Sequence, residues 1–168
     1  SSIAQTNSGV ISGGGDVTVS GSGLLALTGN NTYLGPTIVT SGVLRVQHAN
    51  ALGSTTAGTV VSSGATLELF GGISLAAEML DLSGTLASGA GANTYNGTLY
   101  LQNGSTIDTS ANSTLIVAVA TSNIGSNEFF KTGPGLLRFT ADPGHIGLFT
   151  INNGVVELQH SGTTDTSF

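Results

Sequence analysis

The chain has 168 residues, of which 26 are glycine, none is cysteine and 7% are charged, with a formal net charge of −6. Three fixed cations, Arg45, Lys131 and Arg138, are too few for a surface that binds nucleic acid or inserts into an anionic membrane. The absence of cysteine excludes disulfides, thiolate metal sites and thiol nucleophiles, and it is compatible with export. The length suits a single domain over 1–168.

Short runs in which apolar residues alternate with small polar ones follow one another along the chain. Each begins at a glycine-containing turn, as in 15–20, 64–69, 84–87, 97–101 and 104–108. A period of two residues indicates β-strands. The best helix candidate, 75–80, has only six residues, so we predict a strand or a single turn there. The aliphatic run 115–119 predicts the most deeply buried strand.

The spacing of the turns indicates how the strands are arranged. Ser41-Gly42, Ser63-Gly64 and Ser83-Gly84 are separated by 22 and 20 residues, which suits a β-solenoid with about 20 residues per coil. With about 4.8 Å between stacked strands, this predicts about eight coils and a rod about 40 Å long. A β-sandwich also has short alternating strands and is the alternative fold.

The chain repeats itself after 112 residues. Nine of the 26 positions from Gly23 to His48 are identical in the second copy, which ends at His160. Self-similarity of this kind is typical of stacked architectures, in which each unit buries its apolar face against a neighbour. We place the two copies at 23–53 and 131–160, and the second departs from the first at 142–145.

One stretch of the first copy follows a dense pattern of glycine, aliphatic and polar residues. Its twelve positions are Gly23, Leu25, Leu27, Gly29, Asn31, Tyr33, Gly35, Thr37, Val39, Gly42, Leu44 and Val46. This pattern resembles the autotransporter-associated β-strand repeat of type V secreted and related bacterial surface proteins. The resemblance implies a right-handed parallel β-helix that is exported and serves as a stalk, adhesin or scaffold. It implies corner glycines and inward leucines and valines, and it does not imply a catalytic residue.

Charged residues suggest a contact between neighbouring coils. Arg45 and Glu68 follow the successive turns at Gly42 and Gly64, so stacked coils would place them one above the other on the outer face. Unlike charges in such a ladder are tolerated and like charges are not. We therefore expect this pair to help fix the register.

Residues with catalytic or ligand-binding chemistry are scattered. Glu78 and Asp81 are the closest acids, and Asp108 could stack near Asp81, but we interpret them as solvated turn residues and predict no catalytic site. The histidines are expected at the surface, and the glycine run 13–15 with Asp16 as a corner rather than a calcium loop. The three tyrosines could form a sugar platform, although Tyr33 is expected to pack inside. We predict no cofactor and no metal.

The two ends of the rod generate further expectations. The phenylalanines are concentrated late in the chain, at 129, 130, 139, 149 and 168, which suggests an aromatic cluster that closes one end. Residues 1–19 carry aliphatic residues and no Lys or Arg, so they could cap the other end or donate a strand to a neighbouring subunit.

The sequence therefore favours a non-catalytic, extracellular, structural or adhesive module of a bacterial surface protein. Its partners would be adjoining coils, other copies of itself, or glycans and proteins of a host or cell surface. The alternative is a subunit that assembles into an extracellular filament by strand exchange or end-to-end stacking. A β-helix enzyme acting on polysaccharide is the third hypothesis.

Overall fold

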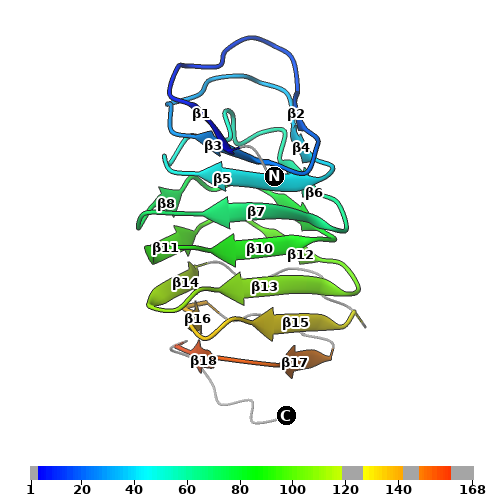
Figure 1. Cartoon of the computed structure of the whole chain (residues 1–168), viewed down its shortest axis with the longest axis vertical. Helices are drawn as coiled ribbons and strands as arrows, with labels where there is room; N and C mark the ends of the chain where they lie inside the picture. Colours follow the sequence, from blue (N-terminus) through cyan, green and yellow to red (C-terminus); the bar gives the residue numbers. More distant parts are fainter. Residues whose placement is uncertain (1–3, 119–126, 142–147, 160–168) are drawn as a thin grey trace.

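The computed structural model describes residues 4–118, 127–141 and 148–159. These residues form eighteen short β-strands, and none of them forms a helix that could cross a membrane. The strands belong to three parallel sheets, which enclose a common interior (Figure 1).

Sheet A is the longest of the three and runs along the whole described length. Its strands, in stacking order, are β1 (Ala4–Asn7), β3 (Leu24–Leu27), β5 (Gly42–Val46), β7 (Ala65–Leu69), β10 (Thr85–Ser88), β13 (Ser105–Thr109), β15 (Phe129–Thr132) and β17 (Phe149–Ile151).

Sheets B and C each contain five strands and form the other two faces. Sheet B consists of β2 (Val17–Val19), β4 (Thr37–Val39), β6 (Thr59–Val61), β9 (Leu80–Leu82) and β12 (Leu99–Leu101). Sheet C consists of β8 (Ser74–Leu75), β11 (Gly91–Tyr95), β14 (Ser113–Val117), β16 (Leu136–Phe139) and β18 (Val155–Leu158).

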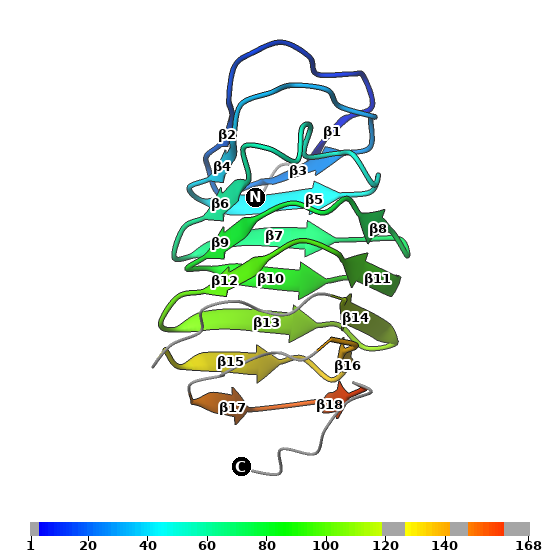
Figure 2. The ribbon, with the colours of Figure 1, turned by 180° about the vertical axis from the view of Figure 1, so that it is seen from behind.

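The chain visits the faces in the order B, A, C and then begins the next coil. The strands of sheet A run from right to left across the front of Figure 1, and the chain returns behind them, as the view from behind shows (Figure 2). The result is a right-handed β-solenoid of about 7 turns with about 21 residues per turn. The predicted solenoid is confirmed, with one turn fewer than expected, and the sandwich alternative is wrong because every paired strand is parallel.

Alternate residues of each strand point into the rod and form columns along its axis. In sheet B the inward column is Val19, Val39, Val61, Leu82 and Leu101. In sheet A it includes Leu25, Leu44, Leu67, Leu86 and Ile107. Each of these side chains packs on its equivalent in the next coil, so the core is a continuous stack of aliphatic residues. Burial of this kind contributes roughly 25 cal/mol per Å² of apolar surface.

The alternation of inward and outward residues tests two predictions made from the sequence. In β14, Leu115 and Val117 are buried but Thr114 and Ile116 are only half-buried, so the aliphatic run is not a strand buried on both faces. Residue 119 lies outside the described residues. The segment 75–80 is the end of β8, an irregular connection and the start of β9, in agreement with the absence of a helix there.

The two sequence copies lie on different faces of the rod. β3, on sheet A, corresponds in sequence to β16 on sheet C, and β5 on sheet A corresponds to β18 on sheet C. The offset of 112 residues is about five and one-third turns at about 21 residues per turn, so the second copy starts one face further round. The repeat therefore specifies a corner with its flanking strands, not a particular face.

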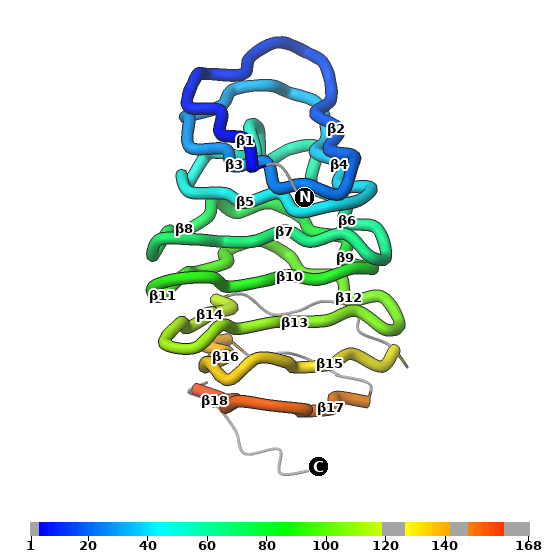
Figure 3. The backbone as a smooth tube through the Cα atoms, viewed as in Figure 1, coloured from blue at the N-terminus to red at the C-terminus, as the bar shows by residue number. Residues whose placement is uncertain are grey.

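The two ends of the rod carry the segments for which the sequence predicted a cap or donor strand and an aromatic cluster. β1 and β2 form the first coil and pair with β3 and β4 of the same chain, at the opposite end from β17 and β18 (Figure 3). The rings of Phe129 and Phe149 stack with centroids 4.2 Å apart. Among the described residues the two rings do not close this end, because Leu148, Ile151, Val155 and Leu158 are exposed there. Phe168 lies outside the described residues.

Replacing Leu67 with alanine tests the inward column. The side chain is fully buried, so we expect Leu67→Ala to reduce the free energy of unfolding by about 2–5 kcal/mol. The matched control is Thr66→Ala, at the neighbouring outward position, which should change it by less than about 1 kcal/mol. Urea unfolding followed by circular dichroism measures both. Equal effects of the two substitutions would contradict the assignment of faces.

Candidate functional site

The structure brings Arg45 and Glu68 together on the outer face of sheet A. The two residues are direct partners in the register of β5 and β7. Arg45 Nε donates to Glu68 Oε2 over 2.8 Å, and Arg45 Nη2 donates to Oε1 over 3.3 Å. The guanidinium also lies 4.2 Å from the centre of the Phe70 ring, a cation–π contact. The pair therefore joins two coils through both oxygens of one carboxylate.

A second ion pair, which the sequence reasoning missed, lies on sheet C. Arg138 and Glu157 are register partners in β16 and β18, and Arg138 Nη2 is 2.8 Å from Glu157 Oε2. The sequence contained a signal for it, because each residue follows a glycine by three positions in consecutive coils, at Gly135 and Gly154.

Lys131, which the sequence reasoning counted only as one of three fixed cations, occupies an inward position. It is fully buried in sheet A, between Ile107 and Ile151 in the register. Its Nζ donates to the main-chain carbonyl oxygens of Thr132, Gly133 and Asn153, at a corner of the rod. Burial lowers the pKa of Lys131, and Asp108 partly offsets this. All three Lys and Arg residues of the chain are therefore either ion-paired or buried.

The residues of the twelve-position pattern that lie between the strands face the interior. Asn31 accepts a bond from Ile11 N over 2.8 Å and donates to Ala51 O over 2.6 Å, so it links the coils on either side. The hydroxyl groups of Tyr33 and Thr37 are 2.5 Å apart, and both side chains are buried. Leu27, Val39, Leu44 and Val46 are fully buried in the columns.

Two glycines of the pattern show why the repeat needs a residue without a side chain. Gly42 has a φ of +76°, and a Cβ there would lie 2.5 Å from Gly21 O of the preceding coil. Gly35 has an ordinary φ, but a Cβ would lie 2.6 Å from Gly15 O. The glycines permit the close approach of one coil to the next.

The three acids considered for catalysis are not brought together. Asp81 lies on the outer face of sheet B and accepts a bond from Gln102 over 2.8 Å. Asp108 lies on the outer face of sheet A and accepts a bond from Thr132 over 2.7 Å. The expected stacking of Asp108 near Asp81 is therefore wrong, because the two belong to different sheets.

Glu78 is not a solvated turn residue, as the sequence suggested, but is only 4% exposed. Its carboxylate accepts a bond from the Thr59 hydroxyl. Burial raises the pKa of Glu78 to about 7, and the bond from Thr59 lowers it in part. Burial also raises the pKa of Tyr33 to about 12 and that of Tyr95 further, with a smaller contribution from the charge of Glu78.

Among the described residues, the tyrosines and histidines considered as ligand-binding residues do not come together. Tyr33 and Tyr95 are buried and Tyr100 lies on the outer face of sheet B, so the three tyrosines form no sugar platform. In the described part of the chain, His, Asp and Glu residues form no cluster that could hold a metal. His48 accepts a bond from Asn50 N over 3.1 Å, whereas His145 and His160 lie outside the described residues.

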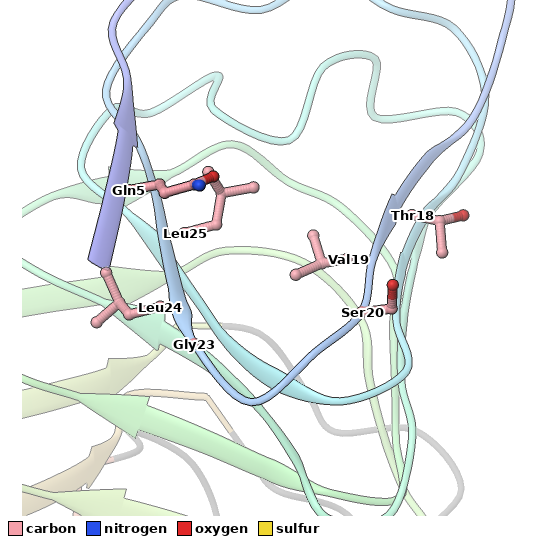
Figure 4. Close-up of a pocket in the computed structure, with 7 residues that line it drawn as sticks. All are labelled: Gln5, Thr18, Val19, Ser20, Gly23, Leu24 and Leu25. Atoms are coloured by element: carbon pink, nitrogen blue, oxygen red, sulfur yellow. The ribbon is translucent and has the colours of Figure 1, made fainter. Parts of the chain in front are cut away.

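A pocket of about 290 Å³ lies at the N-terminal end of the rod, between β1 and β2. Its lining includes Gln5, Val19 and Leu25, and Val19 and Leu25 point toward one another across the gap (Figure 4). Because these residues belong to the inward columns, the pocket is the open end of the solenoid interior rather than a cleft in its side.

We expect Arg45→Glu to reduce the free energy of unfolding by roughly 1–2 kcal/mol, because it removes the bidentate pair and places two acids opposite each other. The double variant Arg45→Glu, Glu68→Arg should recover part of this loss. Thermal unfolding of the four proteins in a double-mutant cycle measures the coupling. A coupling energy of zero would show that the pair does not contribute to register.

Comparison with known proteins relates this architecture to one group of proteins. Residues 17–46 and 129–158 match the family described as Passenger-associated-transport-repeat. The chain is similar to the adhesin BmaC autotransporter of Brucella suis biovar 1 (strain 1330), with 33% identity over 153 residues, which are 90% of this chain and 4% of that protein. The chain thus spans a small part of this relative. No solved structure matches it. The chain is therefore a β-solenoid with a match to the Passenger-associated-transport-repeat family near each end of its described length.

Proposed function

We propose that this solenoid is a non-catalytic, adhesive segment of a bacterial autotransporter-type protein, exposed at the cell surface. The observation that carries the proposal is the combination of two passenger repeats with similarity to an adhesin over most of the chain. The architecture suits this role, because a rod of stacked coils presents long, flat outer faces while its interior is filled with side chains.

The positions of the Lys and Arg residues restrict the charge that a binding partner can carry. Arg45 and Arg138 are neutralised by Glu68 and Glu157, and Lys131 is buried. With a net charge of −6, the surface offers no free Lys or Arg to phosphate, sulfate or sialic acid groups. The partner should therefore be neutral or basic, for example a neutral glycan or a basic protein surface, and not a nucleic acid or an anionic membrane.

The placement of the acids supports a non-catalytic role. Glycoside hydrolysis needs two carboxyl groups within about 5–10 Å on either side of the bond that is cleaved. Here Asp81 and Asp108 lie on the outer faces of different sheets, and Glu78 lies inside the rod.

Beads coated with the purified chain test the adhesive function. We expect them to bind cultured epithelial cells above the level of albumin-coated beads, and we expect free chain to compete. Because Arg45 and Arg138 are ion-paired and Lys131 is buried, removal of heparan sulfate with heparinase, or of sialic acid with sialidase, should leave binding to the cells unchanged. Binding at the albumin level would reject adhesion and leave a role as a spacer, whereas loss of binding after either enzyme treatment would contradict the partner class.

A filament subunit remains the second candidate, and the ends of the rod favour it. The last coil exposes Leu148, Ile151, Val155 and Leu158, and the first coil opens into the pocket lined by Val19 and Leu25. A contact between these two different surfaces of neighbouring copies would be head-to-tail, and such a contact repeats without closing.

Negative-stain electron microscopy of the purified chain at neutral pH tests this candidate. A filament would show an axial repeat close to the length of the rod, and Ile151→Asp, at a position 52% exposed on the last coil, should abolish it. Val60→Asp, at a position 39% exposed on the side of sheet B, is the matched control and should leave filaments intact. Short monodisperse rods in the unmodified protein would reject filament formation.

A further inference from the structure

Glu78 lies in a part of the solenoid where the regular strand stacking is interrupted. It belongs to the connection between β8 and β9, residues 76–79, which has no strand structure. The connection is held by main-chain bonds from Ala76 N to Ala49 O over 3.0 Å and from Thr59 N to Met79 O over 2.8 Å. Its neighbours in sequence, Ala77 and Met79, are exposed. The backbone of this connection therefore runs close to the surface while the carboxyl group of Glu78 is turned inward.

The surroundings of the Glu78 carboxyl group suit its neutral form. A carboxylate has about four acceptor sites, yet the described residues supply one donor, the Thr59 hydroxyl. The nearby Tyr95 hydroxyl is engaged elsewhere, because it donates to the main-chain carbonyl of Glu78. The Tyr33 hydroxyl is bonded to Thr37. The ionised carboxylate is thus buried with one hydrogen bond and without a cation.

The titratable groups that face Glu78 carry no compensating charge. They are Tyr33 and Tyr95, and both hydroxyl groups are held neutral because burial raises their pKa values. The main chain of Glu78 packs directly against the next coil, where a Cβ at Gly97 would overlap it, and the interior of the rod is filled with side chains. The route that relieves an ionised carboxylate is therefore outward, toward the solvent beside Ala77 and Met79.

We propose that Glu78 makes the middle of the solenoid responsive to pH: the protonated side chain stays packed beneath the connection 76–79, and its ionisation loosens that connection. The pKa of about 7, which results from burial, places this change at neutrality. The effect is local, because β7, β9 and β10 on either side keep their aliphatic columns.

The direction of the pH dependence follows from the raised pKa. Between an ordinary value of 4.5 and about 7, the unfolded chain releases the Glu78 proton and the folded chain keeps it. The stabilisation by protonated Glu78 is therefore complete below about pH 4.5, declines as the pH rises, and is lost above about pH 7. The shift corresponds to an increase in the unfolding equilibrium constant on the order of 10²-fold from pH 5 to pH 8.

Two measurements on the whole chain test the proposal. Carbonyl ¹³C NMR of glutamate-labelled protein gives the titration midpoint, and the signal lost in Glu78→Gln assigns it. Hydrogen exchange of peptides covering 74–80, corrected for intrinsic exchange, compares pH 5.5 with pH 8. We expect a midpoint near 7 and faster corrected exchange at pH 8 in the unmodified chain. Glu78→Gln, which keeps an acceptor for Thr59 without the charge, should show slow exchange at both values.

Asp81→Asn is the matched control, because Asp81 lies three residues away on the outer face of β9. It should leave both the midpoint of Glu78 and the exchange difference unchanged. A midpoint in the ordinary range near 4.5 would overturn the proposal. So would the same exchange difference in the unmodified chain and in Glu78→Gln.

Discussion

Parallel stacking of one coil on the next, in register, is the constraint on which every other feature of this molecule depends. The hydrogen bonds of each strand run along the axis to the equivalent strand of the neighbouring coil, so like positions lie above like positions over the whole rod. Inward positions such as Leu44, Leu67 and Leu86 become continuous columns, and outward positions such as Arg45 and Glu68 become surface pairs. A shift by one residue would exchange the two sets, which is why the register is strongly specified.

Neighbouring coils supply hydrogen bonds to several buried polar groups of the interior, whereas the hydroxyl groups of Ser105 and Thr109 have no partner among the described residues. Asn93 illustrates complete satisfaction, since it accepts bonds from Gly72 N and Ile73 N and donates to Ser88 Oγ and Ala90 O. Lys131 donates to three carbonyl groups at a corner. Glu78 is a carboxylic acid with a single donor, so the cost of burying it depends on pH, whereas the amide of Asn93 does not titrate. Buried groups with complete hydrogen bonding, such as Asn93, add specificity to the stacking. Glu78, which has a single donor, adds a response to pH.

The passenger repeat and the proposed adhesive role involve different residues. Most side chains of the repeat pattern, such as Asn31, Tyr33 and Val39, point inward and are buried. The repeat thus describes how a coil is built and leaves the outward positions free to vary. Because the second copy is displaced by one face, equivalent outward residues such as Arg45 and Glu157 lie on sheets A and C. A partner that binds one face therefore meets a surface that the repeat does not dictate.

The sequence by itself determined the fold class, the length of a coil and the inward direction of the patterned leucines and valines, because strand period and turn spacing are local properties of the chain. It also predicted the pairing of Arg45 with Glu68, since both residues follow corner glycines in successive coils. It did not determine which face each copy occupies, because small differences in coil length accumulate to a third of a turn only after several coils. Nor did it distinguish buried Glu78 and Lys131 from solvated charges. Their burial depends on which side of an irregular connection or strand faces the interior, and stacking against neighbouring coils decides that.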